Sequence, residues 1–283
     1  MFKYSNTNKR YYTLDYYYKS KYNSKISKIS LNQGCTCPNK DGTKGYGGCI
    51  YCSYSGSGDY AGNPNISLTD QFYQIKEIMD KKWKNDKYIA YFQANTNTYA
   101  PLEKLKKNFE EVLTYDNVVG INIATRPDAI TEECYNYLED LNKRTDLVIE
   151  LGLQTIHEET TKLINRGHDL KCFEDALNEL NKRNIKVLVH VINGLPYETK
   201  DMMIETIKYL SNKNIWGIKI HMLHIIKNTK LAQIYEEKPL LNYRVLQKCQ
   251  APLQALLRHY PDSLTQKVRA RHRKYPSNSG NCP

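Results

Sequence analysis

Six short apolar runs that alternate with longer amphipathic stretches constrain the fold of this chain more than any other feature. Several runs are nearly continuous in Ile, Val and Leu, which is typical of parallel strands covered on both faces. The runs predict strands over residues 25–33, 88–93, 118–125, 147–153, 186–192 and 217–223. Apolar residues at three- and four-residue spacing predict helices between them, over residues 70–84, 102–114, 131–142, 173–183 and 200–212. This alternation indicates an α/β fold with a parallel sheet, either doubly wound or curled into a barrel.

Positive charge is concentrated at the two ends of the 283-residue chain, which carries a formal net charge of +11. Residues 1–30 contain seven Lys or Arg and one Asp, and residues 243–283 contain eight and one. Basic ends suggest a polyanionic partner such as nucleic acid, although surface lysine often does no more than solvate a protein. We expect a basic, tyrosine-rich N-terminal extension over residues 1–25, a core over 26–242 and a C-terminal tail over 243–283.

The apolar residues, 40% of the chain, are distributed as in a globular protein. No uncharged apolar run approaches the ~18 residues that suggest a membrane-spanning helix. The N-terminus also lacks the apolar region of a secretory signal. We therefore expect a cytoplasmic globular protein with no membrane partner.

Four cysteines lie within eighteen residues directly after the first predicted strand: Cys35, Cys37, Cys49 and Cys52. In a cytosolic chain such a cluster is more typical of a metal site than of disulfides. Cys49 and Cys52 form a C-x-x-C pair, and Cys37 or Cys35 supplies a third ligand. Four thiolates would close a structural zinc site, whereas three would bind a [4Fe–4S] cluster with one iron left open. The cluster alone favours zinc, but a loop at the carboxyl end of a barrel strand is where such folds place their chemistry.

Six sequence blocks in this chain resemble the radical S-adenosylmethionine (SAM) enzymes. In order they are CPNKDGTKGYGGCIYC with GSGDYAG, YFQANTNTYAP, IATRPDAI, IELGLQTIHEETTKLINRGH, HVINGLPYETKDMM and GIKIHMLH, from about residue 27 to 231. Within that family the resemblance is to the YhcC/YtqA-like branch and, more distantly, to the radical domain of the Elongator catalytic subunit.

The resemblance implies a partial (β/α)6 TIM-like barrel of the radical SAM type, with short N-terminal and C-terminal extensions. It also implies two cofactors, a [4Fe–4S] cluster and S-adenosylmethionine, and it places Cys37, Cys49 and Cys52 as the iron ligands. We favour Cys37 over Cys35 because Pro38 follows Cys37, as in the family pattern.

The same resemblance assigns contacts with S-adenosylmethionine. Tyr51 would lie against the adenine, and Gly194 would let the backbone approach the adenosine. The methionine amino group would be held by polar groups at and after the end of the second strand: Gln93, Asn95 and Asn97. The ribose hydroxyls and the methionine carboxylate would be held by Gln154 and Arg166, and Glu150 would face the same interior.

Plainer interpretations exist for several of these residues. The run from Asn95 to Thr98 reads as an ordinary polar turn, and Glu150 and Arg166 could form a structural ion pair. Each histidine near the strand ends is more often a core residue than a substrate contact: His190, His221 and His224. The GSGDYAG run follows the cysteines instead of opening a helix, so we interpret it as part of the cluster loop and not as a phosphate loop.

The expected function is reductive cleavage of S-adenosylmethionine and hydrogen abstraction from a substrate. A one-electron donor such as flavodoxin or ferredoxin would be required. The resemblance to YtqA-like members suggests tRNA as substrate, with the 5-carboxymethylaminomethyl group of the wobble uridine converted to aminomethyl. Seven tyrosines among the basic residues of segment 1–30 suit contacts with phosphates and unpaired bases. The alternatives are a protein or small-metabolite substrate, or a zinc-stapled, non-catalytic RNA-binding protein.

Overall fold

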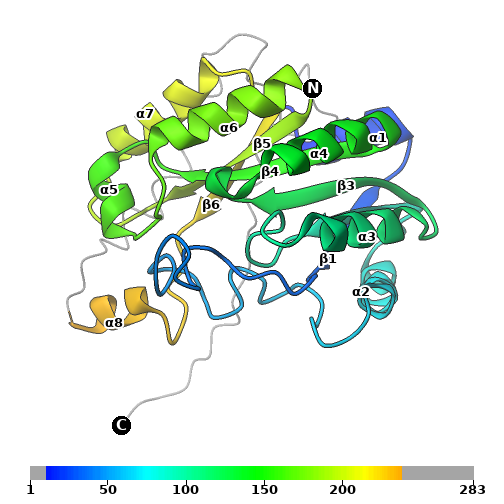
Figure 1. Ribbon diagram of the computed structural model, residues 1–283, viewed down its shortest axis with the longest axis horizontal. Helices are drawn as coiled ribbons and strands as arrows, with labels where there is room; N and C mark the ends of the chain where they lie inside the picture. The colour runs from blue at the N-terminus through cyan, green and yellow to red at the C-terminus, as the bar shows by residue number, and fades with distance from the viewer. Residues whose placement is uncertain (1–10, 238–283) are drawn as a thin grey trace.

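Six parallel strands form an open half-barrel in the computed structural model, which describes residues 11–237 (Figure 1). The sheet order follows the chain: β1 (Ile26–Leu31), β2 (Lys87–Phe92), β3 (Val118–Thr125), β4 (Asp146–Gln154), β5 (Lys186–Asn193) and β6 (Gly217–Met222). A doubly wound sheet would reverse its strand order, so that alternative is wrong. The predicted α/β half-barrel and its six strands are confirmed.

Five helices connect the strands and cover the outer face of the sheet, as the spacing of apolar residues predicts. They are α2 (Leu68–Lys82), α3 (Leu102–Leu113), α4 (Glu132–Arg144), α6 (Leu170–Lys182) and α7 (Lys200–Ser211). Four of them have an N-cap residue whose side chain accepts a hydrogen bond from a backbone N–H of the first turn. These N-cap residues are Ser67, Thr131, Asp169 and Thr199. The sequence did not predict α1 (Leu14–Tyr22), the 3₁₀ turn η1 (Pro127–Ala129), α5 (Glu158–Leu163) or α8 (Lys230–Glu237). None of the helices described is long and apolar enough to span a bilayer.

Side chains alternate between the two faces of each strand, and this alternation separates the core from the barrel interior. Outward-facing Ile, Leu, Val and Phe pack against the helices; Phe92, Phe109 and Phe173 are fully buried there. The inward-facing positions at mid-height are mostly polar: Lys28, Tyr91, Asn122, Glu150, His190 and Lys219. The concave side is therefore a polar chamber.

Helix α1 closes the amino-terminal end of this chamber. Leu14 and Tyr18 are buried against Ile89, and the ring of Tyr17 lies 5.2 Å from that of Trp216, directly before β6. Tyr22 Oη donates to Asp146 over 2.7 Å at the start of β4. The prediction that N-terminal tyrosines stack on RNA bases is wrong for Tyr18, which is 3% exposed. The predicted boundary between extension and core is untested, and the predicted tail, 243–283, lies outside the described residues.

Candidate active site

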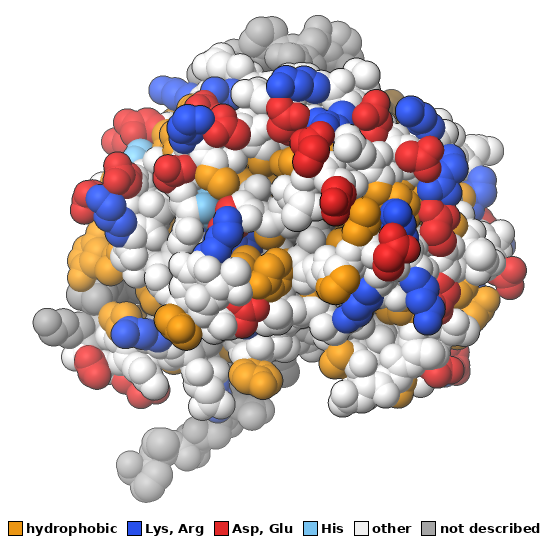
Figure 2. All heavy atoms as spheres, in the orientation of Figure 1, with side chains coloured by type: hydrophobic (Ala, Val, Ile, Leu, Met, Phe, Trp, Pro, Cys, Tyr) orange, Lys and Arg blue, Asp and Glu red, His pale blue; other side chains and the backbone are white. Residues whose placement is uncertain are grey.

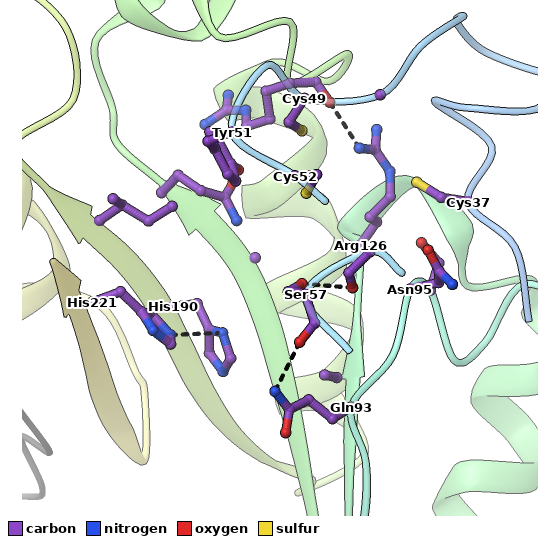
Figure 3. A pocket seen from close by; sticks show the side chains of 18 of the residues that line it. Cys37, Cys49, Tyr51, Cys52, Ser57, Gln93, Asn95, Arg126, His190 and His221 are labelled. Carbon is purple, nitrogen blue, oxygen red and sulfur yellow. Dashed lines mark hydrogen bonds between the residues drawn. The ribbon is translucent and has the colours of Figure 1, made fainter. Parts of the chain in front are cut away.

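A cavity of about 260 Å³ opens at the carboxyl ends of the strands. The connection between β1 and α2 supplies one side of the wall, and the ends of β2 to β6 supply the other. Cys37, Cys49 and Cys52 all line the cavity, and Figure 3 shows their sulfur atoms in its upper part, around Arg126.

Backbone hydrogen bonds anchor the segment that carries Cys49 and Cys52. The N–H of Ile50 donates to the carbonyl of Ile164 after α5, over 3.0 Å, and its carbonyl accepts from Leu231 in α8, over 2.9 Å. The side chain of Ile50 is buried in a small apolar cluster with Ile164 and Leu231, and Tyr51 packs against it. These contacts tie the C-x-x-C pair to two distant segments of the chain.

The GSGDYAG run packs directly on the end of β2. A Cβ on Gly56 would lie 1.8 Å from Asn95 Oδ1, and one on Gly58 would lie 2.5 Å from the Cβ of Ala94. Only glycine permits this close approach. The interpretation of the run as part of the cluster loop agrees with this packing.

The electrostatic surroundings favour the thiolate form at Cys49. The thiol of Cys52 donates to Cys49, and this bond is the main reason that the pKa of Cys49 falls to about 6 while that of Cys52 rises. Arg126 acts on Cys49 in the same direction. Thiolate is the form that binds metal, and three thiols that line one cavity match the number of cysteine ligands of a [4Fe–4S] cluster with one open iron.

Cys35 is separate from this set. It is 5% exposed, belongs to the main apolar core, and burial raises its pKa to about 11. The cavity wall does not include it. Four converging thiolates are therefore not present, and the four-cysteine zinc site considered from the sequence is wrong.

Most of the residues predicted to contact S-adenosylmethionine line the same cavity: Tyr51, Gln93, Asn95, Glu150, Gln154 and Arg166. Gln154 is the most informative of them. Its Oε1 is buried with no hydrogen-bond partner among the described residues, and its backbone has a φ of 65°. A buried acceptor without a donor is costly, and strained backbone of this kind concentrates at functional sites. The cavity thus offers an acceptor to a hydroxyl-bearing ligand.

Arg166 is 2% exposed and bonded to backbone carbonyls. Its Nη1 donates to Leu153 over 2.5 Å and to Thr155 over 2.8 Å, and its Nε donates to His168 over 3.0 Å. Its partners are carbonyls and not Glu150, so the suggested ion pair of these two residues is wrong. Whether Arg166 also contacts the methionine carboxylate stays a prediction.

Asn97 and Gly194 do not line the cavity. The Asn97 amide is fully buried and donates to the carbonyls of Phe92 and Ala124 over 3.1 and 2.9 Å, so it ties the ends of β2 and β3 together. Gly194 has a φ of 84° and turns the chain after β5. The structure therefore brings the other predicted contacts of S-adenosylmethionine together around the cavity, and Asn97 and Gly194 lie outside its wall.

Glu150 is the centre of the polar layer below the cysteines. One carboxylate oxygen accepts from Lys28 (2.5 Å) and Asn122 (2.7 Å), and the other accepts from His190 (2.7 Å) and Lys219 (3.1 Å). Burial alone would raise the pKa of Glu150, but Lys219, Lys28 and His190 hold it well below its usual range. The predicted contact of Glu150 with S-adenosylmethionine stays a prediction beside this observed role.

The three histidines all line the cavity. His190 donates its Nε2–H to Glu150, and its Nδ1 lies 3.3 Å from His221 Nε2 (Figure 3). Burial, and then the charge of Lys219, lower the pKa of His190 to about 4, so this ring is neutral at pH 7. His224 lies beyond the end of β6.

Sequence reasoning missed four cationic residues of this region: Lys28, Lys40, Arg126 and Lys219. Lys40 holds the cluster loop through the carbonyls of Ser53 and Tyr54, at 3.0 and 3.1 Å. The available signal was a lysine in the middle of a short predicted strand, at Lys28 and Lys219. Arg126 stands in the quoted IATRPDAI block, but nothing in its spacing pointed to the cysteines.

Three thiols that line one cavity, on the first connection of a parallel half-barrel, are the arrangement expected of an enzyme whose iron–sulfur cluster has three cysteine ligands. Residues 39–210 match the Radical SAM superfamily, to which the chain belongs. Enzymes of this superfamily use a [4Fe–4S] cluster and S-adenosylmethionine, which are the cofactors of this chain as well.

Among relatives, the uncharacterized protein YtqA of Bacillus subtilis (strain 168) is 52% identical over 236 residues, which cover 83% of this chain and 73% of that protein. Protein YhcC of Escherichia coli (strain K12) is 34% identical over 217 residues, covering 76% and 69%. The predicted YhcC/YtqA-like resemblance is confirmed. The solved structure of Methanocaldococcus infernus Elp3 superposes with a TM-score of 0.61 at 18% identity, covering 89% of this chain and 57% of that one, and shows a common fold.

Proposed function

We propose that this protein is a tRNA-modifying radical SAM enzyme that converts the 5-carboxymethylaminomethyl group of a wobble uridine to aminomethyl. The observation that carries the enzymatic part is the convergence of Cys37, Cys49 and Cys52 on one cavity. The tRNA part rests on weaker similarity. The tRNA uridine(34) acetyltransferase of Methanocaldococcus infernus is 27% identical over 150 residues, half of this chain and 28% of that protein.

When bound, the cluster and S-adenosylmethionine supply a 5′-deoxyadenosyl radical for hydrogen abstraction, with the electron coming from a donor such as flavodoxin or ferredoxin. In this proposal, Cys37, Cys49 and Cys52 hold the cluster. Gln154 presents its unpaired Oε1 to a ribose hydroxyl. The ring of Tyr51, packed beside Ile50, forms a wall against the adenine. These side chains bind and orient the cofactors and exclude water around them.

Exposed aromatic residues around the cavity suit an RNA partner better than α1 does. Tyr46, Tyr54 and Tyr60 in the β1–α2 connection, and Tyr197 after β5, are all more than 60% exposed. Such rings stack on unpaired bases of an anticodon loop. Acidic and basic side chains are interspersed over the face seen in Figure 2. The proposal therefore assigns contacts with unpaired bases to these exposed tyrosines.

Nucleoside analysis of tRNA tests this proposal. Bulk tRNA from cells that lack the gene is digested and compared with tRNA from cells complemented by the wild type or by Cys49→Ala. We expect 5-carboxymethylaminomethyluridine to accumulate and the aminomethyl form to disappear, with rescue by the wild type only. Identical nucleosides in all strains would contradict the tRNA substrate and direct attention to a protein or small metabolite.

A further inference from the structure

Arg126 brings a guanidinium group to the part of the cavity that carries the cysteines. It directly follows β3 and lines the cavity together with Cys37, Cys49 and Cys52. In the view of Figure 3 its guanidinium lies between the sulfur atoms of Cys37 and Cys49. Only 11% of the Arg126 side chain is exposed, and arginine stays protonated in proteins. A permanent positive charge is therefore held beside the three thiols.

Three hydrogen bonds fix the orientation of this guanidinium. Its Nε and Nη2 donate to the two carboxylate oxygens of Asp128, both over 2.9 Å, and its Nη1 donates to the carbonyl of Arg166 over 2.8 Å. Lys44 also contacts Asp128, because its Nζ donates to the Asp128 carbonyl over 2.8 Å and lies 3.7 Å from Oδ2. A bidentate pair restricts arginine to one geometry, so the charge of Arg126 has a defined position.

The same bonds leave part of the guanidinium unused. A guanidinium carries five N–H groups, and Arg126 uses three of them. The other two, one on Nη1 and one on Nη2, have no acceptor among the described residues. A nearly buried donor without an acceptor is costly, and the contacts with Asp128 and Arg166 do not explain these two. An anionic group bound in the cavity would supply the acceptors.

We infer that Arg126 raises the reduction potential of the iron–sulfur cluster. The oxidised cluster takes up one electron from its donor, and the reduced cluster then carries one more negative charge. Burial in the cavity disfavours the more negative form, whereas a fixed cation and N–H donors near the sulfur atoms favour it. Arg126 thus makes the cluster easier to reduce without touching the substrate. The inference goes beyond the proposed function, since it depends on the three cysteine ligands and not on tRNA.

The test is a potentiometric titration of the anaerobically reconstituted full-length protein, without S-adenosylmethionine or RNA. The reduced cluster is followed by electron paramagnetic resonance. Arg126→Gln should lower the equilibrium constant for reduction by about tenfold, the scale of one charge-assisted interaction, which is about 59 mV for one electron. Arg126→Lys keeps the charge but not the planar fork, so its potential should fall by less. Iron content and visible absorption show beforehand that each variant holds the cluster.

Asp128→Asn separates an electrostatic role of Arg126 from a structural one. This variant removes the negative partner and leaves the arginine charge in place, so we expect the reduction potential to rise. A merely structural role predicts shifts in the same direction for Arg126→Gln and Asp128→Asn, because both break the same bidentate pair. Opposite shifts would therefore support the inference.

Arg183→Gln is the matched control. Arg183 is 12% exposed and pairs with Glu179 and Glu132 over 2.6 and 2.5 Å, but it lies outside the cavity wall. Its variant should keep the wild-type potential.

An unchanged potential in cluster-loaded Arg126→Gln would overturn the inference, and so would a lower potential in both Arg126→Gln and Asp128→Asn. If Arg126→Gln loses the cluster, Asp128→Asn decides alone, and an unchanged or lower potential there would overturn it. A wild type without a cluster would refute the ligand assignment itself. None of these results bears on the tRNA substrate, because no RNA is present.

Discussion

Replacing Glu150 by Gln tests the polar layer through stability. The two carboxylate oxygens accept from four donors: Lys28, Asn122, His190 and Lys219. A glutamine keeps one acceptor oxygen and turns an NH₂ group toward two of these donors, whichever way the amide is placed. Both lysines also lose their shared counter-charge.

Removing one partner of a buried ion group costs about 3–5 kcal/mol. For a chain of this size we expect a fall in melting temperature on the order of 10 °C. Urea unfolding followed by circular dichroism at pH 7 measures the free energy directly, with wild type and variant in the same cluster state.

Glu198→Gln is the matched control. Glu198 is 9% exposed, burial raises its pKa, and its Oε1 has no partner among the described residues. Because burial disfavours the charged form of Glu198, replacing it by the neutral amide should lower the free energy of unfolding by less than about 1 kcal/mol. Equal losses in the two variants, or a loss below about 1 kcal/mol in Glu150→Gln, would refute the argument that charge sharing stabilises this layer.

The pH dependence has a definite sign. The folded-state pKa of Glu150 lies well below its usual range. Its contribution is therefore present above the unfolded-state pKa of about 4.3, and it is lost as the pH falls from there toward the folded-state value. The difference in free energy of unfolding between wild type and Glu150→Gln should be constant near pH 7 and should narrow only below about pH 4.3. If that difference disappears between pH 7 and 5, Glu150 is not the group responsible for it.

Three further predictions concern the cofactor site and the base of the barrel. Arg166→Ala should retain iron but weaken S-adenosylmethionine binding by about tenfold, since the loss of a charge-assisted hydrogen bond costs that much. Equilibrium dialysis measures the binding of S-adenosylmethionine, and iron analysis measures the iron content. Loss of iron would point to a structural role for Arg166. Gly56→Ala should cost about 1–3 kcal/mol by urea unfolding, because its Cβ would meet Asn95. Gly47→Ala is its control, since Gly47 also has a positive φ but nothing lies within 4 Å of its Cβ, and an equal loss would refute the steric reason. Tyr18→Phe should leave stability unchanged or raise it, because the Tyr18 hydroxyl is buried without a partner among the described residues; a loss above about 1 kcal/mol would contradict that.

The architecture was largely predictable because it depends on local periodicity. The runs that form β1 to β6 are apolar for reasons visible within each run, and their boundaries shifted by at most a few residues. The cysteines were found in the same way, since a C-x-x-C spacing is local. Helix α5 has six residues, too few to show a helical period. Helix α1 was missed because its tyrosines suggest a surface segment, whereas they fill the open end of the half-barrel.

The site was predictable only in part because its contacts join distant residues. Strand alternation places Lys28, Glu150 and Lys219 on one face, but it does not say which side chains meet. Lys28 and Glu150 are 122 residues apart in the sequence, and Lys219 and Glu150 are 69 apart. Cys35 and Cys37 are two residues apart in sequence, yet one faces the core and the other the cavity. The family pattern favoured Cys37 through Pro38, and the folded chain supplies the physical reason.

The most direct test of the account is the formation of 5′-deoxyadenosine by the anaerobically reconstituted protein with dithionite and S-adenosylmethionine. The account predicts that wild type and Cys35→Ala bind a [4Fe–4S] cluster and release 5′-deoxyadenosine, whereas Cys49→Ala does neither. A colourless wild-type protein with no 5′-deoxyadenosine would contradict the central claim that the three thiols facing the cavity hold the cluster. Equal loss in Cys35→Ala and Cys49→Ala would contradict the assignment of the ligands.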